Sequence, residues 1–140
     1  MNENLNIRRI AFAVRNLDSA RVVFESLLQA EFAPCPGMQS TEVQCLEWSR
    51  GGGRPIFELV QPVDEDSAIA RFIRKRGEGI HHLTVTVPNL DEAIASVTGA
   101  GGRVVLARSY YRDADGEPLK EAFLHPKDVN GVLFHVVEES

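Results

Sequence analysis

Two stretches of the chain, IRRIAFAVRNLDSA at residues 7–20 and IHHLTVTVPNLDEA at residues 80–93, are copies of one pattern. Each begins with an isoleucine and two polar residues, continues with an alternating apolar run, and then reaches Asn-Leu-Asp. Alternation of this kind predicts a half-buried β-strand, and the apolar residues that follow at helical spacing predict a helix. The repeat therefore predicts a chain built from two copies of one module.

Three shorter strand-like runs follow each predicted helix, so each half is expected to have the order βαβββ. The first helix is expected to be capped by Asp18 or Ser19, and the second is expected to begin at Asp91. We expect an α+β fold in a single domain, residues 1–140, divided into a first module at 6–61, a connector with a short helix at 62–79, and a second module at 80–138. The later strands are expected near residues 31–33, 42–48, 55–61, 103–108, 120–124 and 132–138.

Composition excludes several classes of protein. The chain has 140 residues, of which 44% are hydrophobic and 25% charged, and its formal net charge is −5. Because the basic residues form no long run and no apolar stretch reaches the length of a membrane span, neither nucleic acid nor a membrane is an expected partner. The start of the sequence lacks the apolar core of a signal peptide, so we expect a cytoplasmic protein in which Cys35 and Cys45 are reduced thiols.

Four polar residues occupy equivalent places in the two halves. Arg9 and His82 stand at the third position of the two repeats, and Glu58 in FELV matches His135 in FHVV. Because side chains alternate along a strand, each of these residues points away from its apolar neighbours. We expect a pseudo-twofold packing of the halves to bring all four into one ligand-binding cavity. Glu42, Gln44 and Glu47 share another predicted strand, and alternation alone leaves open which of them face that cavity.

The tandem βαβββ order, with polar residues on the first and last strands of each half, resembles the vicinal oxygen chelate superfamily of glyoxalases, bleomycin-resistance proteins and dioxygenases. Within it, the stretches DSAIARFIRKRGEGIHHLTVTV, FLHPKDVNGVLFHVVE and ELVQPV are similar to methylmalonyl-CoA epimerases. The resemblance implies a cupped sheet, a homodimer, an acyl-CoA or related small-molecule ligand, and a divalent metal such as Zn, Co, Mn, Ni or Fe. The family holds that metal at four positions, which correspond here to Arg9, Glu58, His82 and His135.

Arginine and histidine replace the family's histidine and glutamate at two of these positions, Arg9 and His135. A guanidinium stays protonated and cannot ligate a metal. In one interpretation Glu58, His82 and His135 still form a three-ligand metal site. In the other, the site is metal-free because Arg9 pairs with Glu58 and supplies a fixed positive charge for a carboxylate or an enolate.

The resemblance favours an epimerase-like isomerase or lyase that abstracts a proton next to a carbonyl and stabilises the enolate. His135 is the expected proton carrier if it is not a ligand. The alternatives are a binding protein that sequesters a small molecule without turnover and a non-haem iron oxygenase. The expected catalytic residues are Arg9, Glu58, His82 and His135. The expected substrate-binding residues are Arg9, Lys127 and Tyr110, the last within an extended loop, SYYRDADGEP, at residues 109–118.

Overall fold

The computed structural model describes residues 3, 5–35, 43–51, 55–111 and 118–139 of the chain. The chain divides into two compact units, Arg9–His81 and a second made of Met1–Arg8 with His82–Ser140. The order of elements is βαβββ in each half, with a helix between the halves, which confirms the predicted α+β class and the tandem repeat. None of the helices in the described ranges is long and apolar enough to cross a membrane.

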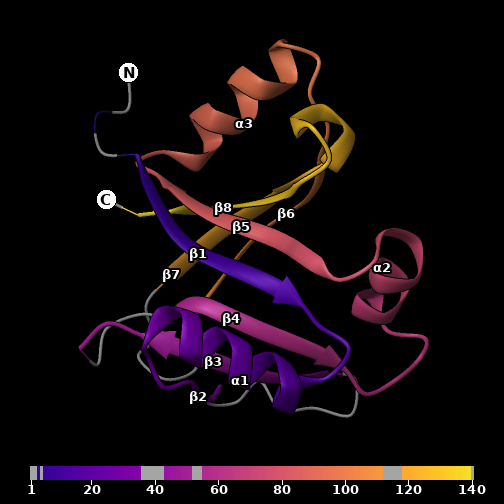
Figure 1. Cartoon of the computed structure of the whole chain (residues 1–140). Coiled ribbons are helices and arrows are strands. Elements are labelled where there is room, and N and C mark those ends of the chain that lie inside the picture. The colour runs from indigo at the N-terminus through magenta and orange to yellow at the C-terminus, as the bar shows by residue number, and fades with distance from the viewer. Residues whose placement is uncertain (1–2, 4, 36–42, 52–54, 112–117, 140) are drawn as a thin grey trace. The chain divides into compact units, whose positions relative to one another are not determined.

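The first half contains four strands and two helices (Figure 1). The strands lie in the order β2-β3-β4-β1, with β1 parallel to β4 and the other neighbours antiparallel. The elements are β1 (Asn6–Ala13), α1 (Leu17–Leu28), β2 (Ala33–Pro34), β3 (Val43–Ser49), β4 (Pro55–Pro62) and α2 (Ala68–Arg76).

The two faces of this sheet have different coverings because side chains alternate along each strand. On one face, Phe12, Leu46 and Leu59 pack with Phe24 of α1 in an apolar cluster. On the opposite face, the buried side chains of Ala13, Cys45 and Val60 pack with Ile69 and Ile73 of α2. Arg9 and Glu58 have the same parity as this second group, so they lie on the face that α1 does not cover.

The second half repeats this plan with one helix against its sheet (Figure 1). The strands lie in the order β5-β8-β7-β6, with β5 parallel to β8 and the other neighbours antiparallel. α3 packs through Leu90 and Ile94 against Ala122 and Val136. The elements are β5 (Gly79–Val87), α3 (Leu90–Gly99), β6 (Val104–Tyr111), β7 (Pro118–Leu124), the 3₁₀ helix η1 (Pro126–Val129) and β8 (Leu133–Glu138).

The helix starts differ from the sequence prediction by one to three residues. Asn16, not Asp18 or Ser19, caps α1, because its Oδ1 accepts a hydrogen bond of 2.9 Å from the backbone N–H of Ser19. Asn89 caps α3 in the same way, with 3.0 Å to the N–H of Glu92. The repeated asparagine of Asn-Leu-Asp is therefore the residue that starts each helix.

Two further predictions were wrong. Cys35 and Cys45 are joined in a disulfide, with 5.4 Å between their Cα atoms, rather than being two reduced thiols. The segment expected to be a loop at residues 109–118 is strand at both ends, because β6 continues to Tyr111 and β7 begins at Pro118. The rest of that segment, residues 112–117, lies outside the described residues.

Candidate functional site

The face of the first-half sheet opposite α1 carries a first polar cluster, which consists of Arg9, Glu47 and Glu58. Strand register brings its members together, since Glu58 pairs with Ala11 of β1 on one side and with Glu47 of β3 on the other. Arg9 Nε lies 3.2 Å from Glu58 Oε1. The side chains of Arg9 and Glu58 are 22% and 4% exposed, so a buried carboxylate pairs with a partly exposed arginine.

Both carboxylates of this cluster are harder to ionise than usual. Burial raises the pKa of Glu58; Arg9 opposes the shift, and the negative charge of Glu47 adds to it. Burial also raises the pKa of Glu47, again opposed by Arg9. Arg9 is thus the positive charge that two neighbouring carboxylates share.

The second half carries a second polar cluster, which consists of Thr84, Arg108, Glu121 and His135. His135 pairs with Thr84 of β5, and Glu121 pairs with Arg108 of β6. The His135 imidazole joins two buried groups, since Nδ1 lies 3.0 Å from Thr84 Oγ1 and Nε2 lies 2.6 Å from Glu121 Oε2. The other oxygen of Glu121, Oε1, accepts a hydrogen bond from Nε of Arg108.

Glu121 is only 3% exposed, yet it is held in its charged form. Burial acts to raise the pKa of Glu121, but the hydrogen bonds from His135 and Arg108 outweigh burial and lower that pKa below its ordinary value. The ring of Phe123 stacks on His135 with centroids 4.5 Å apart and an interplanar angle of 16°. The His82 ring stands edge-on to His135 with centroids 6.3 Å apart. This arrangement can hold a proton on an oriented imidazole.

The donor chemistry of the predicted metal positions does not fit a divalent ion. Arg9 stands at one position and has no lone pair to offer. At another, Nε2 of His135 lies 2.6 Å from Glu121 Oε2 and Nδ1 lies 3.0 Å from Thr84 Oγ1, so a metal ion would have to displace one of these partners. Within the described ranges, no group of three or more His, Cys, Asp or Glu residues could hold a metal ion. The four positions lie in two units: Arg9 and Glu58 in one, His82 and His135 in the other.

The remaining predicted residues are placed as follows. Lys127 is exposed on η1, where its backbone N–H donates to Nδ1 of His125. Tyr110 lies in β6, and its side chain is outside the part of the chain that the structure describes. The assignment of both to substrate binding stays a prediction.

Sequence reasoning missed Glu121 and left the orientation of Glu47 open. Glu121 lies in the strand LKEAFL. Its side chain points to the face opposite that of Ala122 and Leu124, which pack toward α3. A charged residue between Leu119 and Phe123, the apolar residues of its own parity, was the available signal. Its partner could not be read from the sequence, because it depends on the register between β7 and β8.

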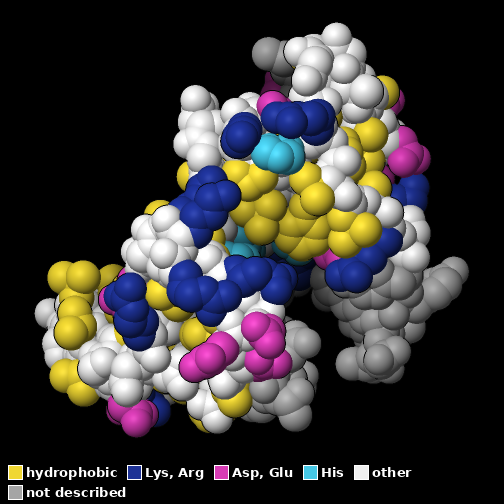
Figure 2. Space-filling view, turned by 90° about the vertical axis from the view of Figure 1, so that its right-hand side faces the viewer, with side chains coloured by type: hydrophobic (Ala, Val, Ile, Leu, Met, Phe, Trp, Pro, Cys, Tyr) yellow, Lys and Arg dark blue, Asp and Glu magenta, His cyan; other side chains and the backbone are white. Residues whose placement is uncertain are grey.

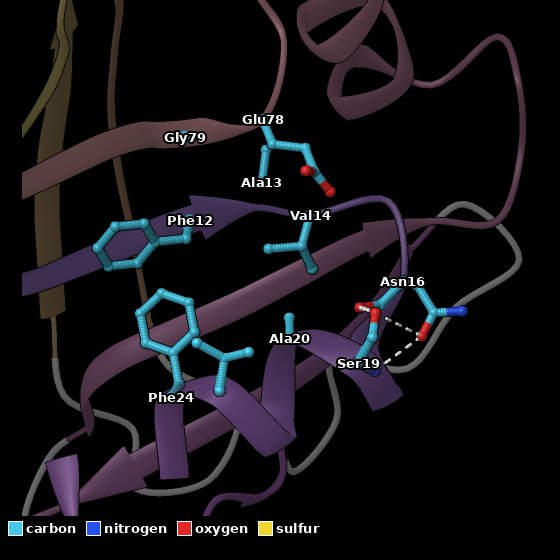
Figure 3. A pocket seen from close by; sticks show the side chains of 10 residues that line it. Phe12, Ala13, Val14, Asn16, Ser19, Ala20, Phe24, Glu78 and Gly79 are labelled. Atoms are coloured by element: carbon cyan, nitrogen blue, oxygen red, sulfur yellow. Dashed lines mark hydrogen bonds between the residues drawn. The ribbon is translucent and has the colours of Figure 1, made fainter. Parts of the chain in front are cut away.

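A hollow of about 390 Å³ lies near α1 in the first half (Figure 3). Phe12, Phe24 and Val14 supply apolar walls, and the hydrogen-bonded side chains of Asn16 and Ser19 lie at one side. Its acidic residue, Glu78, accepts a hydrogen bond of 2.7 Å from the backbone N–H of Arg15. With its polar groups engaged in local structure, this hollow offers weaker acid–base chemistry than the two polar clusters.

Comparison with known proteins identifies the superfamily to which the chain belongs. Residues 8–120 match the model of the glyoxalase/bleomycin resistance protein/dioxygenase superfamily. The match covers well over half of the chain, and it contains the first polar cluster, the whole connector and the elements from β5 to β6. The chain belongs to this superfamily.

The similar proteins include methylmalonyl-CoA epimerases. An ethylmalonyl-CoA/methylmalonyl-CoA epimerase of Cereibacter sphaeroides is 31% identical over 128 residues, which cover 91% of this chain and 92% of that one. The mitochondrial methylmalonyl-CoA epimerase of Bos taurus is 30% identical over 91% of this chain and 70% of its own length. The crystal structure of methylmalonyl-CoA epimerase from Mycobacterium tuberculosis has a TM-score of 0.69 at 28% identity, and covers 96% of this chain and 87% of that one.

Proposed function

We propose that this protein is an epimerase-like isomerase that removes and returns a proton next to the carbonyl of an acyl-CoA or a related carboxylated thioester. Membership of the superfamily and similarity to proteins named methylmalonyl-CoA epimerase support this reaction class. The observation that carries the proposal is the Arg9 guanidinium, anchored by buried Glu58 on a sheet face that α1 leaves uncovered.

Arg9 has the chemistry that an enolate requires. Removal of a proton next to a thioester carbonyl places negative charge on the carbonyl oxygen, and a preorganised cation in a site of low polarity stabilises that charge. The ion pair with Glu58 uses Nε, one of the three guanidinium nitrogens, and 22% of the Arg9 side chain is exposed. We assign Arg9 to enolate stabilisation and substrate binding, and Glu58 to holding Arg9 in place.

His135 is the proposed proton carrier. Its imidazole is 13% exposed, whereas Glu121 and Thr84, which flank it, are almost fully buried. A neutral imidazole can both accept and return a proton. His82, edge-on to His135, is the proposed second acid–base group.

We also propose that the reaction is independent of a divalent metal. The ground for this is the donor set: a guanidinium at Arg9 and an imidazole whose two nitrogens are engaged at His135. In this proposal the fixed charge of Arg9 does the work that a Lewis-acidic ion does elsewhere in the superfamily.

The ligand is proposed to be anionic. Lys and Arg side chains recur beside hydrophobic ones on the surface shown in Figure 2. Within the first half, the last turn of α2 carries three exposed basic residues, Arg74, Lys75 and Arg76. Such a surface suits a molecule with phosphate or carboxylate groups and an apolar arm. The homodimer and the cytoplasmic location stay predictions. Because cytoplasmic thiols are normally reduced, the Cys35–Cys45 disulfide makes the location worth testing directly.

The test is solvent-hydrogen exchange. Protein treated with a chelator is incubated with methylmalonyl-CoA in D₂O, and deuterium at the carbon next to the thioester is followed by mass spectrometry. We expect catalysed exchange that Arg9→Met slows by about 100-fold, as loss of one oxyanion donor does. Arg15→Met is the matched control, since Arg15 pairs with Glu78 through exposed side chains.

Two outcomes would contradict the proposal. Tight binding of malonyl-type thioesters with no exchange would identify a sequestering protein instead of an enzyme. Exchange that disappears with the chelator and returns with Zn²⁺ or Co²⁺ would overturn metal independence.

A further inference from the structure

We propose that Glu121 is a positioning residue that holds the His135 imidazole in a single tautomer, with the proton on Nε2 and with Nδ1 as the nitrogen that accepts a proton. The inference rests on the proposed function in one respect, because it takes His135 to be the proton carrier. The geometry of the second polar cluster carries the rest.

The tautomer follows from the partners of the two ring nitrogens. An ionised carboxylate can only accept hydrogen bonds, so the contact of 2.6 Å between Glu121 Oε2 and Nε2 requires a proton on Nε2. In the neutral ring the lone pair is then on Nδ1, which lies 3.0 Å from the hydroxyl of Thr84. A hydroxyl can donate or accept. Thr84 therefore donates to Nδ1 of the free neutral ring, and a substrate that gives its proton to Nδ1 takes the place of this hydroxyl during that step.

Two further contacts fix the ring. Phe123 lies opposite His135 in the β7–β8 register and stacks on the imidazole. His82 of β5 stands edge-on to the ring. These contacts and the two hydrogen bonds oppose a ring flip, which would exchange the places of Nδ1 and Nε2.

Arg108 keeps Glu121 in the form that the tautomer requires. A carboxyl group as buried as Glu121 would take up a proton if it lacked partners, and a protonated carboxyl could donate to His135 rather than accept from it. The guanidinium of Arg108 hydrogen-bonds the oxygen that His135 does not use. The cluster thus works as an ordered chain in which Arg108 holds Glu121 charged and Glu121 orients His135.

The experiment compares Glu121→Gln, Glu121→Asp and the wild-type protein by two independent measurements. The first is the His135 tautomer, read from ¹⁵N–¹H correlation spectra of the imidazole at a pH at which the ¹⁵N shifts themselves show the ring to be neutral. The second is deuterium exchange into methylmalonyl-CoA, with kcat and KM determined separately. Asp128→Asn is the control, because it removes a carboxylate that pairs with Arg103 at a distance of 2.9 Å elsewhere in the same half.

We expect the wild-type protein to show the Nε2–H tautomer alone. Glu121→Gln should give a mixture of tautomers, because a neutral amide can donate as well as accept. It should lower kcat by roughly 10- to 100-fold with little change in KM, as loss of an orienting partner does. Glu121→Asp should keep the tautomer and recover part of kcat. Asp128→Asn should change neither the His135 tautomer nor the kinetics of exchange.

An unchanged single tautomer in Glu121→Gln would overturn the inference. If that variant proves too unstable to study, Arg108→Gln tests the same chain from its exposed end, and it should give a smaller shift in the same direction. A shifted tautomer in a protein whose wild-type form catalyses no exchange would support the orienting role of Glu121 and overturn the proposed function, so the two failures are distinguishable.

Discussion

The two halves of the chain share a fold, but the pKa values of their buried glutamates are shifted in opposite directions. In the first half, Arg9 is shared by Glu58 and Glu47, and both carboxylates have raised pKa values because burial outweighs one guanidinium. In the second half, Glu121 is equally buried but has two donors, Arg108 and His135, and its pKa is lowered. Hydrogen bonds and charge from two partners therefore offset burial at Glu121, whereas at Glu58 the charge of Arg9 alone opposes it.

Register shows where the halves diverged. Ala11 pairs with Glu58 as Thr84 pairs with His135, so an alanine in one half stands where the other has the hydroxyl that binds the imidazole. Cys45 pairs with Val60 as Glu121 pairs with Val137. The place that holds a disulfide sulfur in the first half thus holds the orienting carboxylate in the second. The same backbone supports a covalent link in one copy and a hydrogen-bonded chain in the other.

The largest effect that tests this comparison is expected from Arg9→Met. Removing one partner of a buried pair leaves an uncompensated charge on Glu58, so the free energy of unfolding should fall by about 3 kcal/mol at about pH 8. The loss should be smaller at about pH 5, because the pKa of Glu58 rises further without Arg9 and the carboxyl takes up a proton. Urea unfolding followed by circular dichroism at both pH values measures this.

The exposed pair of Arg15 and Glu78 supplies the control for that measurement. Arg15→Met should change the free energy of unfolding by less than about 1 kcal/mol at either pH. An equal loss in Arg9→Met at both pH values would show that the guanidinium acts through packing and not through the charge of Glu58.

A second prediction separates the halves by the sign of their pH dependence. The raised pKa of Glu58 means that its contribution to stability falls as pH rises from the ordinary glutamate value through the raised one. The lowered pKa of Glu121 means that its contribution is present above the ordinary value and is lost as pH falls through the lowered one. The destabilisation by Glu58→Gln should therefore shrink with rising pH, whereas that by Glu121→Gln should grow, each by on the order of 1 kcal/mol. The measurement is the free energy of unfolding of both variants and the wild-type protein across acidic and neutral pH. If the two destabilisations change in the same direction as pH rises, the contrast between the halves is refuted.

The smallest effect is expected where the halves are alike. Asn16→Ala and Asn89→Ala each remove a side-chain cap with nearly the same geometry, 2.9 Å and 3.0 Å. Each should lower the free energy of unfolding by about 1 kcal/mol, and the two losses should agree. Thermal unfolding of both variants measures this, and a large difference between them would show that the repeat is equivalent in sequence but not in local energetics.

The parts of the fold that depend on local periodicity could be predicted from the sequence. Alternation and helical spacing gave both βαβββ modules and the connector helix, because side-chain direction repeats over a few residues. The parts that depend on strand register could not. The disulfide requires Cys35 to lie beside β3, and the contact of Glu121 with His135 spans 14 positions across two strands. The pairing of Arg9 with Glu58 was predicted as one of two alternatives because the repeat itself marked those positions.

The Arg9–Glu58 ion pair also limits the routes by which this chain can evolve. A single exchange of either partner leaves a charged or polar group without its counterpart in a buried position, so most one-step changes lose stability before they gain a new activity. Departure from the present site by mutation is therefore expected to pass through paired substitutions on β1 and β4, or to follow a stabilising change elsewhere. In an ancestral reconstruction, the arginine and the carboxylate should have been acquired close together in time.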